Sequence, residues 1–131
     1  MNEEKKYGEE FSACPVIYAL NLIGGKWHLP VIWLLNRDAV LRYNEIKRRI
    51  CGITNMMLTQ TLKDLEEKGL VHRVQYPEIP PRVEYSLTEN GQRLLPALDE
   101  LAKWGITQFE QHAANQDGKY RCSECEIITS E

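Results

Sequence analysis

Four cysteines are the side chains of this 131-residue chain best suited to covalent or metal chemistry. The first ten residues are charged and polar, with no basic start leading into an apolar run, so we expect neither a secretory signal nor a membrane span. The chain is therefore expected to be cytoplasmic, where thiols stay reduced. Reduced cysteines are candidates for metal binding or redox chemistry rather than for structural disulfides. They are Cys14, Cys51, Cys122 and Cys125.

Cys122 and Cys125 have the spacing of half a zinc site. Two residues separate them, as in many thiolate sites, but a tetrahedral site needs two further ligands. His112, or the same pair in a second subunit, would have to supply them. Because the chain has no second pair of this kind, a reversible local disulfide or a disordered tail is favoured, and we expect no bound metal and no cofactor.

Other residue types that often perform catalysis do not form a recognisable group. His28, His72 and His112 are far apart in the sequence, and no two of them have ligand spacing. The chain has no glycine-rich phosphate loop, no serine elbow and no paired acidic motif. A thiol oxidoreductase using Cys122 and Cys125 is the best enzymatic alternative, but it would need a βαβ unit that the sequence does not contain. We therefore expect no catalytic activity.

The first half of the chain is predicted to form four short helices, each with apolar residues at helical spacing. Pro15 suits a first helical turn, and Pro30 is tolerated because it also falls in a first turn. Thr54 is placed to cap the fourth helix through its hydroxyl, directly after a turn at Gly52. The third and fourth helices, joined by this tight turn, form a helix-turn-helix. The four helices are expected over Pro15–Ile23, Leu29–Leu35, Arg42–Ile50 and Asn55–Lys68.

Two strands and a long helix are predicted to follow. Leu70–Tyr76 and Val83–Leu87 alternate apolar and polar residues, and the proline-rich segment between them cannot continue a ladder. A hairpin with a stiff tip that carries Arg82 therefore follows the helix-turn-helix, and a hairpin in this place is a wing. Thr88 is expected to cap the final helix, in which Pro96 should cause a kink or a restart.

The predicted fold is a mainly α winged helix-turn-helix with a small β-hairpin. We expect a flexible N-terminal arm over residues 1–12, the winged domain over 13–114, and a C-terminal tail over 115–131. The apolar stripes of the first and last helices exceed what so small a core needs, so we expect a second copy of the chain to cover them. The residues expected at this dimer interface are Val16, Ile17, Leu20, Leu98, Leu101, Trp104 and Phe109.

The exposed face predicted for the fourth helix suits DNA reading. If Leu58 faces inward, Leu62 and Leu65 share its side, and the opposite side begins with uncharged hydrogen-bonding groups and ends in charge. Asn and Gln pair with adenine edges in the major groove, while Thr and Met contact thymine methyl groups. The expected DNA-binding residues are Thr54, Asn55, Met56, Thr59, Gln60 and Lys63 on this helix, Lys47, Arg48 and Arg49 on the preceding one, and Arg82 on the wing.

Each of these side chains also has an ordinary structural explanation. Polar residues are common on an exposed helix face, and Arg82 could pair with Glu78 or Glu84 instead of entering a minor groove or holding a phosphate. The order helix, glycine turn, helix, hairpin favours DNA binding. So does the charge distribution, because residues 36–82 carry nine Lys and Arg against six Asp and Glu, although the whole chain has a net charge of −3.

Short motifs along residues 14–110 resemble those of the HxlR-type winged helix-turn-helix regulators. Their combination is far more specific than any one of them. Pro30 and the tail with Cys122 and Cys125 depart from the family pattern. The matching segments are Cys14–Val16, Leu22–Trp27, Arg42–Ile46, Gly52–Thr54, Met57–Leu62, Leu65–Glu66, Gly69–Val71, Pro80–Thr88 and Trp104–Gly105.

The resemblance implies a transcription factor that acts as a homodimer joined by its first and last helices. Its two recognition helices would enter successive major grooves of a pseudo-palindromic operator. Some members sense electrophiles or oxidants through the cysteine of a Cys-Pro-Val segment, which Cys14 matches, and a helix N-terminus favours the thiolate form. Cys51 of the other subunit would be a candidate resolving thiol. The alternative is that Cys14 only packs at the dimer interface and that Cys51 is an incidental turn residue.

The expected partners are double-stranded DNA, a second copy of the chain, and an oxidant or small-molecule effector, with no membrane. A winged-helix protein-interaction module without DNA binding is the main alternative, because a fold does not fix a function. Salt-dependent binding to a palindromic promoter fragment separates the two.

Overall fold

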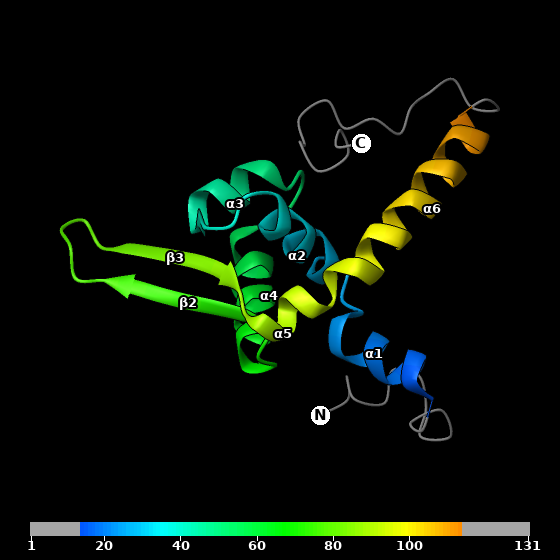
Figure 1. Ribbon diagram of the computed structural model, residues 1–131. Helices are drawn as coiled ribbons and strands as arrows, with labels where there is room; N and C mark the ends of the chain where they lie inside the picture. Colours follow the sequence, from blue (N-terminus) through cyan, green and yellow to red (C-terminus); the bar gives the residue numbers. More distant parts are fainter. Residues whose placement is uncertain (1–13, 114–131) are drawn as a thin grey trace.

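The computed structural model describes residues 14–113, which form six helices and three strands in this part of the chain (Figure 1). The predicted arm and tail, including Cys122 and Cys125, lie outside the described residues, and the domain bounds stay predictions. The elements are α1 (Pro15–Ile23), α2 (His28–Arg37), β1 (Leu41–Arg42), α3 (Tyr43–Arg49), α4 (Asn55–Glu67), β2 (Val71–Tyr76), β3 (Arg82–Leu87), α5 (Glu89–Arg93) and α6 (Leu95–Ala113).

The core lies where α2, α3 and α4 meet one another and the base of the sheet. It is built from aliphatic side chains spaced three or four residues apart, so that each helix buries one side. This is the apolar spacing from which the helices were predicted, and the predicted helix-turn-helix is confirmed. The fully buried or nearly buried members from the helices are Val31, Ile32, Leu34, Leu35, Ile46, Leu58, Leu62 and Leu65.

The sheet is antiparallel, with strand order β1-β3-β2. The predicted hairpin of β2 and β3 is confirmed, but β1 was not predicted, because two residues are too few for an alternating pattern. β1 pairs Leu41 with Tyr85 and so covers one edge of β3. The prediction that Arg82 lies at the wing tip is wrong: Arg82 is the first residue of β3 and pairs with Tyr76 in the ladder. The tip is the segment 77–81.

The last two helices are separated by a break that the sequence anticipated. Thr88 caps α5, because its hydroxyl accepts a hydrogen bond from the Gly91 N–H at 3.0 Å. Pro96 has no N–H to continue the helical ladder, and its ring crowds the carbonyl of Gln92, so the chain leaves α5 at Leu94 and restarts as α6. The predicted restart is confirmed.

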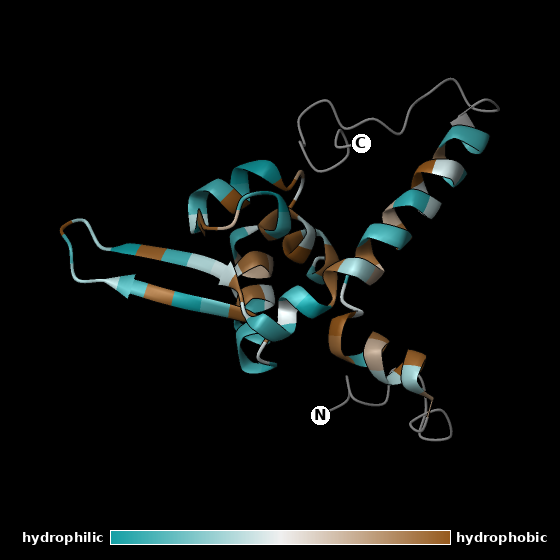
Figure 2. Cartoon of the chain, viewed as in Figure 1, coloured by the Kyte–Doolittle hydropathy of each residue, from teal (hydrophilic) through white to brown (hydrophobic). Residues whose placement is uncertain are grey.

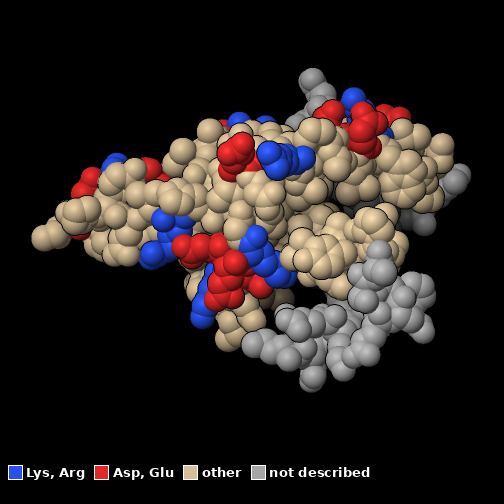
Figure 3. All heavy atoms as spheres, turned by 60° about the horizontal axis from the view of Figure 1, so that its bottom comes forward, with Lys and Arg blue, Asp and Glu red and all other residues tan. Residues whose placement is uncertain are grey.

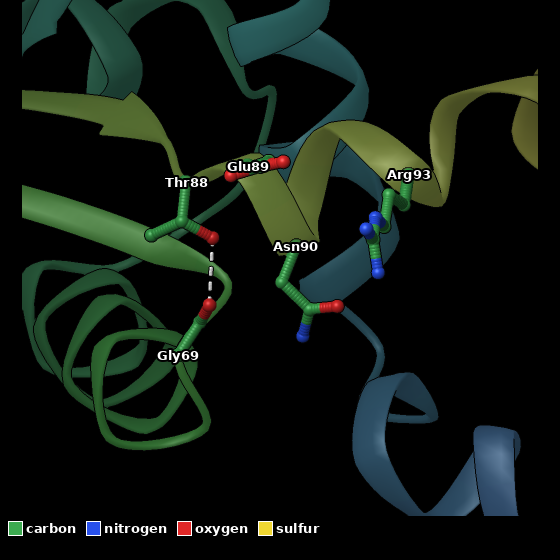
Figure 4. A pocket seen from close by; sticks show the side chains of 5 residues that line it. All are labelled: Gly69, Thr88, Glu89, Asn90 and Arg93. Atoms are coloured by element: carbon green, nitrogen blue, oxygen red, sulfur yellow. Dashed lines mark hydrogen bonds between the residues drawn. The ribbon is translucent and has the colours of Figure 1, made fainter.

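Thr88 also joins α5 to the end of α4. Its hydroxyl donates to the Gly69 carbonyl at 2.6 Å (Figure 4). The same residues, with Glu89, Asn90 and Arg93, line a shallow hollow that is open to solvent. Gly69 has φ 75°, a left-handed conformation that glycine adopts without strain and that lets the chain turn from α4 into β2.

The molecule extends in two directions from this core (Figure 1). The β2–β3 hairpin projects on one side, whereas α1 and α6 project on the other. Hydrophobic residues run along most of α1 (Figure 2), and α1 contains no charged residue. Within residues 14–113, no helix is both long and apolar enough to cross a membrane.

Candidate nucleic-acid interface

The two sides of α4 differ as the sequence predicted. Leu58, Thr61, Leu62 and Leu65 are buried against the rest of the domain. The opposite side is exposed, and Met56, with 78% of its surface accessible, is the most exposed large apolar residue on it. The exposed members of the predicted reading face are Thr54, Asn55, Met56, Thr59, Gln60 and Lys63. The helix therefore offers solvent a row of uncharged hydrogen-bonding groups that ends in a cation.

The start of α4 is fixed by the turn that precedes it. Gly52 has φ 84°, a left-handed conformation that would strain any residue with a Cβ. Ile53 then enters the core, and the Thr54 hydroxyl accepts the Met57 N–H at 3.1 Å. The predicted cap is confirmed, and it leaves the first turn of α4 rigid at the surface.

Tyr43, at the start of α3, is a member of this surface that sequence reasoning missed. Tyr43 is three residues before the buried Ile46, on the same side of the helix, and its ring packs against the core. Its hydroxyl, however, lies 2.9 Å from the Asn55 carbonyl oxygen, 3.4 Å from Asn55 Oδ1 and 3.0 Å from Thr59 Oγ1. Only its residue type signalled this, because tyrosine combines an apolar ring with a polar end.

The three predicted phosphate-binding cations of α3 are not equivalent. Arg48 is exposed, Lys47 and Arg49 are half-buried, and within residues 14–113 Lys47 and Arg48 form no ion pair. Arg49 instead donates to the Asp38 carboxylate, at the end of α2. Its charge is thus partly neutralised inside the fold, whereas Lys47 and Arg48 have no carboxylate within ion-pair distance among residues 14–113.

The two arginines of the wing also differ in whether a carboxylate pairs with them. The Arg82 guanidinium lies 3.2 Å from Glu78 and 3.6 Å from Glu84, and it covers the Tyr76 ring at 4.1 Å from the centroid. Both predicted salt bridges of the structural alternative are therefore present. Arg73 on β2, not considered from the sequence, is exposed and donates to the neutral Gln75 amide at 3.3 Å. Arg73 is the wing cation that is not neutralised by a carboxylate among the described residues.

The far end of α4 is held by charged groups. Asp64 Oδ2 lies 2.7 Å from His28 Nε2 and 2.9 Å from Lys68 Nζ. Lys68 also donates to the Leu22 carbonyl at 3.0 Å, at the end of α1. Partial burial by itself raises the pKa of Asp64, but the hydrogen bonds and positive charges of Lys68 and His28 outweigh it and lower that pKa below its ordinary value. A Cβ on Gly25 would collide with the His28 ring, so a larger residue there would have to displace the ring.

The two cysteines within the described residues lie in different settings. Cys14 is half-buried and is the residue just before the first turn of α1, as predicted. Cys51 is exposed in the turn before α4. Among residues 14–113 no group of three or more His, Cys, Asp or Glu side chains is arranged to hold a metal.

The surface predicted to pair with a second copy is partly exposed. Trp104 is 62% exposed, and Val16 and Leu101 are also exposed, while Ile17, Leu20 and Phe109 are half-buried. The prediction that Leu98 faces the partner needs correction. Its side chain is only 6% exposed and packs in the chain's own core, which leaves little surface for a partner to cover. Tyr18 and Ile106 are exposed on the same two helices and were not predicted. In the space-filling view, the α1 side is broadly uncharged, whereas charged side chains gather around α4 and α5 (Figure 3).

Known proteins share this arrangement. Residues 22–113 match the HxlR-like helix-turn-helix family. A protein of Methanothermobacter thermautotrophicus, named as an uncharacterized HTH-type transcriptional regulator, is 48% identical over 112 residues, which are 86% of this chain and 84% of that protein. The structure of the redox regulator HypR in its oxidized form is 46% identical, with a TM-score of 0.66 over 72% of this chain and 96% of HypR. Its reduced form is 40% identical, with a TM-score of 0.71 over 76% and 98% of the two chains.

Proposed function

The chain belongs to the HxlR-like helix-turn-helix family of transcriptional regulators, and we propose that it binds a pseudo-palindromic operator as a homodimer. The exposed face of α4 carries this proposal. It presents amide, hydroxyl and thioether groups beside a cation, the mixture that reads base edges in a major groove. Two copies of α4 would lie about 34 Å apart, one turn of DNA, if the dimer follows the symmetry of its operator.

The phosphate contacts are assigned to cations that have no carboxylate partner within residues 14–113. The cations of this kind to which we assign phosphate contacts are Lys47 and Arg48 on α3, Lys63 on α4 and Arg73 on the wing. Arg49 and Arg82 contribute less, because nearby carboxylates already offset their charge. Phosphate contacts of this kind hold the protein in register without reading sequence.

The partner surface is assigned to α1 and α6. Val16, Tyr18, Leu101 and Trp104 expose apolar surface on these two helices, and monomeric proteins rarely leave large continuous apolar patches in water. A second copy related by a two-fold axis would cover both helices at once. One chain has a mass of 15.2 kDa, and equilibrium sedimentation should give twice that mass. Replacing Trp104 by Glu should shift the species toward the monomer, while Lys103→Glu serves as the exposed neighbouring control.

DNA binding is tested by selection from a library of randomised duplexes, under reducing and under oxidising conditions. The expected result is an enriched motif with two half-sites related by a dyad, bound with a strong dependence on salt. The absence of an enriched motif under both conditions would contradict the proposal and would favour a winged-helix protein-interaction module.

The residue that senses an oxidant is assigned as Cys14. Three observations support this: its position directly before α1, its partial exposure, and the likeness to a protein named as a redox regulator. The Lys68 hydrogen bond to the Leu22 carbonyl supports a connection from α1 to α4. In the proposed reaction, diamide is reduced to its hydrazine while Cys14 and a second thiol lose their protons and join as a disulfide. Cys51 of the other subunit is the candidate second thiol.

Treatment with diamide should change operator affinity in the native protein, and Cys14→Ser should abolish the change. Non-reducing electrophoresis should show a covalent dimer that is lost in both Cys14→Ser and Cys51→Ser. Cys122→Ser is the matched control and should respond like the native protein. If Cys14→Ser also keeps the full response, Cys14 is not the sensor.

A further inference from the structure

One hydroxyl, that of Tyr43, joins two residues of the α4 reading face. Tyr43 is the first residue of α3, and its Oη lies between Asn55 and Thr59, which are one helical turn apart on α4. The ring is half-buried and packs against the core, and this packing holds the hydroxyl in position. The hydroxyl therefore reaches from α3 to the Asn55 backbone carbonyl and to the side chains of Asn55 and Thr59.

The direction of these hydrogen bonds follows from counting protons. A tyrosine hydroxyl has one proton to donate and lone pairs to accept with. Both of its contacts at Asn55, the carbonyl oxygen at 2.9 Å and Oδ1 at 3.4 Å, are acceptors, so the Tyr43 proton points to Asn55. The contact with Thr59 Oγ1 at 3.0 Å must then be supplied by the threonine proton.

This arrangement determines what each side chain has left for a ligand. The Asn55 amide, with Oδ1 turned toward Tyr43, presents its NH2 donors to solvent. Thr59, whose proton points to Tyr43, presents its lone pairs and its methyl group. The exposed face of α4 thus has a donor at position 55 and an acceptor at position 59.

We propose that Tyr43 is a specificity-determining positioning residue, which sets the donor and acceptor order of the α4 reading face. The proposal rests on the proposed DNA-binding function and deepens it. The base edge opposite Asn55 should be an acceptor, such as guanine N7 and O6 or thymine O4, and the edge opposite Thr59 should be a donor, adenine N6 or cytosine N4. Without the hydroxyl, both side chains can rotate and accept other bases.

Tyr43→Phe is the test, because it removes one oxygen and keeps the ring that packs on the core. The native protein and the variant are each selected on the randomised duplex library, and Kd is then measured by anisotropy for the best operator and for all single-base changes in one half-site. Discrimination should fall roughly 3- to 10-fold at two adjacent or nearly adjacent positions, the size expected from losing one neutral hydrogen bond. Discrimination elsewhere, the salt slope and the affinity for random DNA should not change.

Tyr85→Phe is the matched control, because Tyr85 is a buried tyrosine of β3 whose backbone pairs with Leu41 and Arg73 and not with α4. It should leave discrimination at every position as in the native protein. Thermal unfolding of both variants shows whether each is folded. If Tyr43→Phe is destabilised, Thr59→Val gives an independent route, since it removes the partner hydroxyl and keeps the side-chain shape. Thr59→Val should relax the position opposite residue 59 and leave discrimination opposite Asn55 unchanged, because the Tyr43 proton still points to Asn55.

The outcomes separate the proposal from the function on which it rests. If the native protein selects no motif, the DNA-reading function fails and this inference fails with it. If the native protein selects a motif and Tyr43→Phe discriminates equally well at every position, the function stands and the positioning role is wrong. A uniform loss of affinity for all sequences would also overturn it, because it would mean that Tyr43 itself touches the DNA backbone.

Discussion

The two ends of α4 are held in opposite ways. Near its start, Asn55 and Thr59 are exposed and are held by neutral hydrogen bonds to the Tyr43 hydroxyl. Near its end, Asp64 and Lys68 are joined by charge to each other, to α2 and to α1. The groups at the start keep hydrogen-bonding capacity for a ligand, whereas the charges at the end are used within the fold. One helix thus combines a surface available for binding with an anchor.

Breaking the buried side that both ends share should have the largest effect. Leu58, on the buried side of α4, is fully buried, so Leu58→Ala removes methyl groups and leaves a cavity. The free energy of unfolding, measured by urea denaturation at fixed protein concentration, should fall by about 2–5 kcal/mol. Met56→Ala, on the exposed side, is the control and should change it by less than about 0.5 kcal/mol. Equal effects would mean that α4 does not bury one side as described.

Removing the charge at the anchored end should have the next largest effect. Asp64→Asn should lower the free energy of unfolding near pH 7 by about 1–2 kcal/mol, because charge-assisted hydrogen bonds to Lys68 and His28 are lost. The pKa of Asp64 is lowered in the folded chain, so its contribution is present above the ordinary aspartate value of about 3.9 and disappears as the pH falls below it.

Urea denaturation at pH 7, 5 and 3 follows this dependence. Native protein and Asp64→Asn should differ at pH 7 and 5 and converge toward pH 3. Asp99→Asn is the matched control, because Asp99 forms an exposed pair with Lys103 on α6 and exposed pairs contribute little. If the two variants behave alike, charge does not anchor this end of α4.

Loss of the helix cap at the start of α4 should lower the free energy of unfolding by less than loss of the Asp64 charge does. Thr54→Ala removes the acceptor of the Met57 N–H, and helix caps of this kind contribute about 1 kcal/mol. Thr54→Ser keeps the acceptor and should remain within a few tenths of a kcal/mol of the native protein. Hydrogen exchange of the Met57 amide gives a local readout and should accelerate in Thr54→Ala. Unchanged exchange there would show that the first turn of α4 is held by other contacts.

The smallest effect is expected for two adjacent arginines of α3. Arg48 has no carboxylate partner among residues 14–113, whereas Arg49 pairs with Asp38. Arg48→Gln should weaken DNA binding a few-fold and reduce the slope of log K against log salt by about 0.9, because it removes one phosphate contact. Arg49→Gln should change the slope less, since Arg49 is paired with Asp38, and should lower stability instead. Anisotropy titrations over a range of salt concentrations measure both. Equal slopes in the two variants would contradict the assignment.

Much of the architecture was predictable because it rests on local rules. The apolar spacing of Leu58, Leu62 and Leu65 gave α4 its buried side, and Thr54 gave its start. Pro96 gave the break between α5 and α6. Other features needed contacts between distant segments. β1 exists only because Leu41 and Arg42 pair with β3, and two residues carry no pattern of their own.

The candidate site likewise has some features that follow from local rules and others that need contacts between distant segments. Periodicity within one helix determined which residues of α4 face solvent, because the helical repeat fixes directions locally. Whether a charged or polar group is available for a ligand depends on what lies opposite it, and only the tertiary structure decided that. It paired Arg82 with two glutamates, placed Leu98 in the core, and brought Tyr43 within hydrogen-bond distance of Asn55. The sequence by itself determined the helices, the hairpin and the exposed face of α4; the packing between elements decided where β1 forms and which exposed groups remain unpaired.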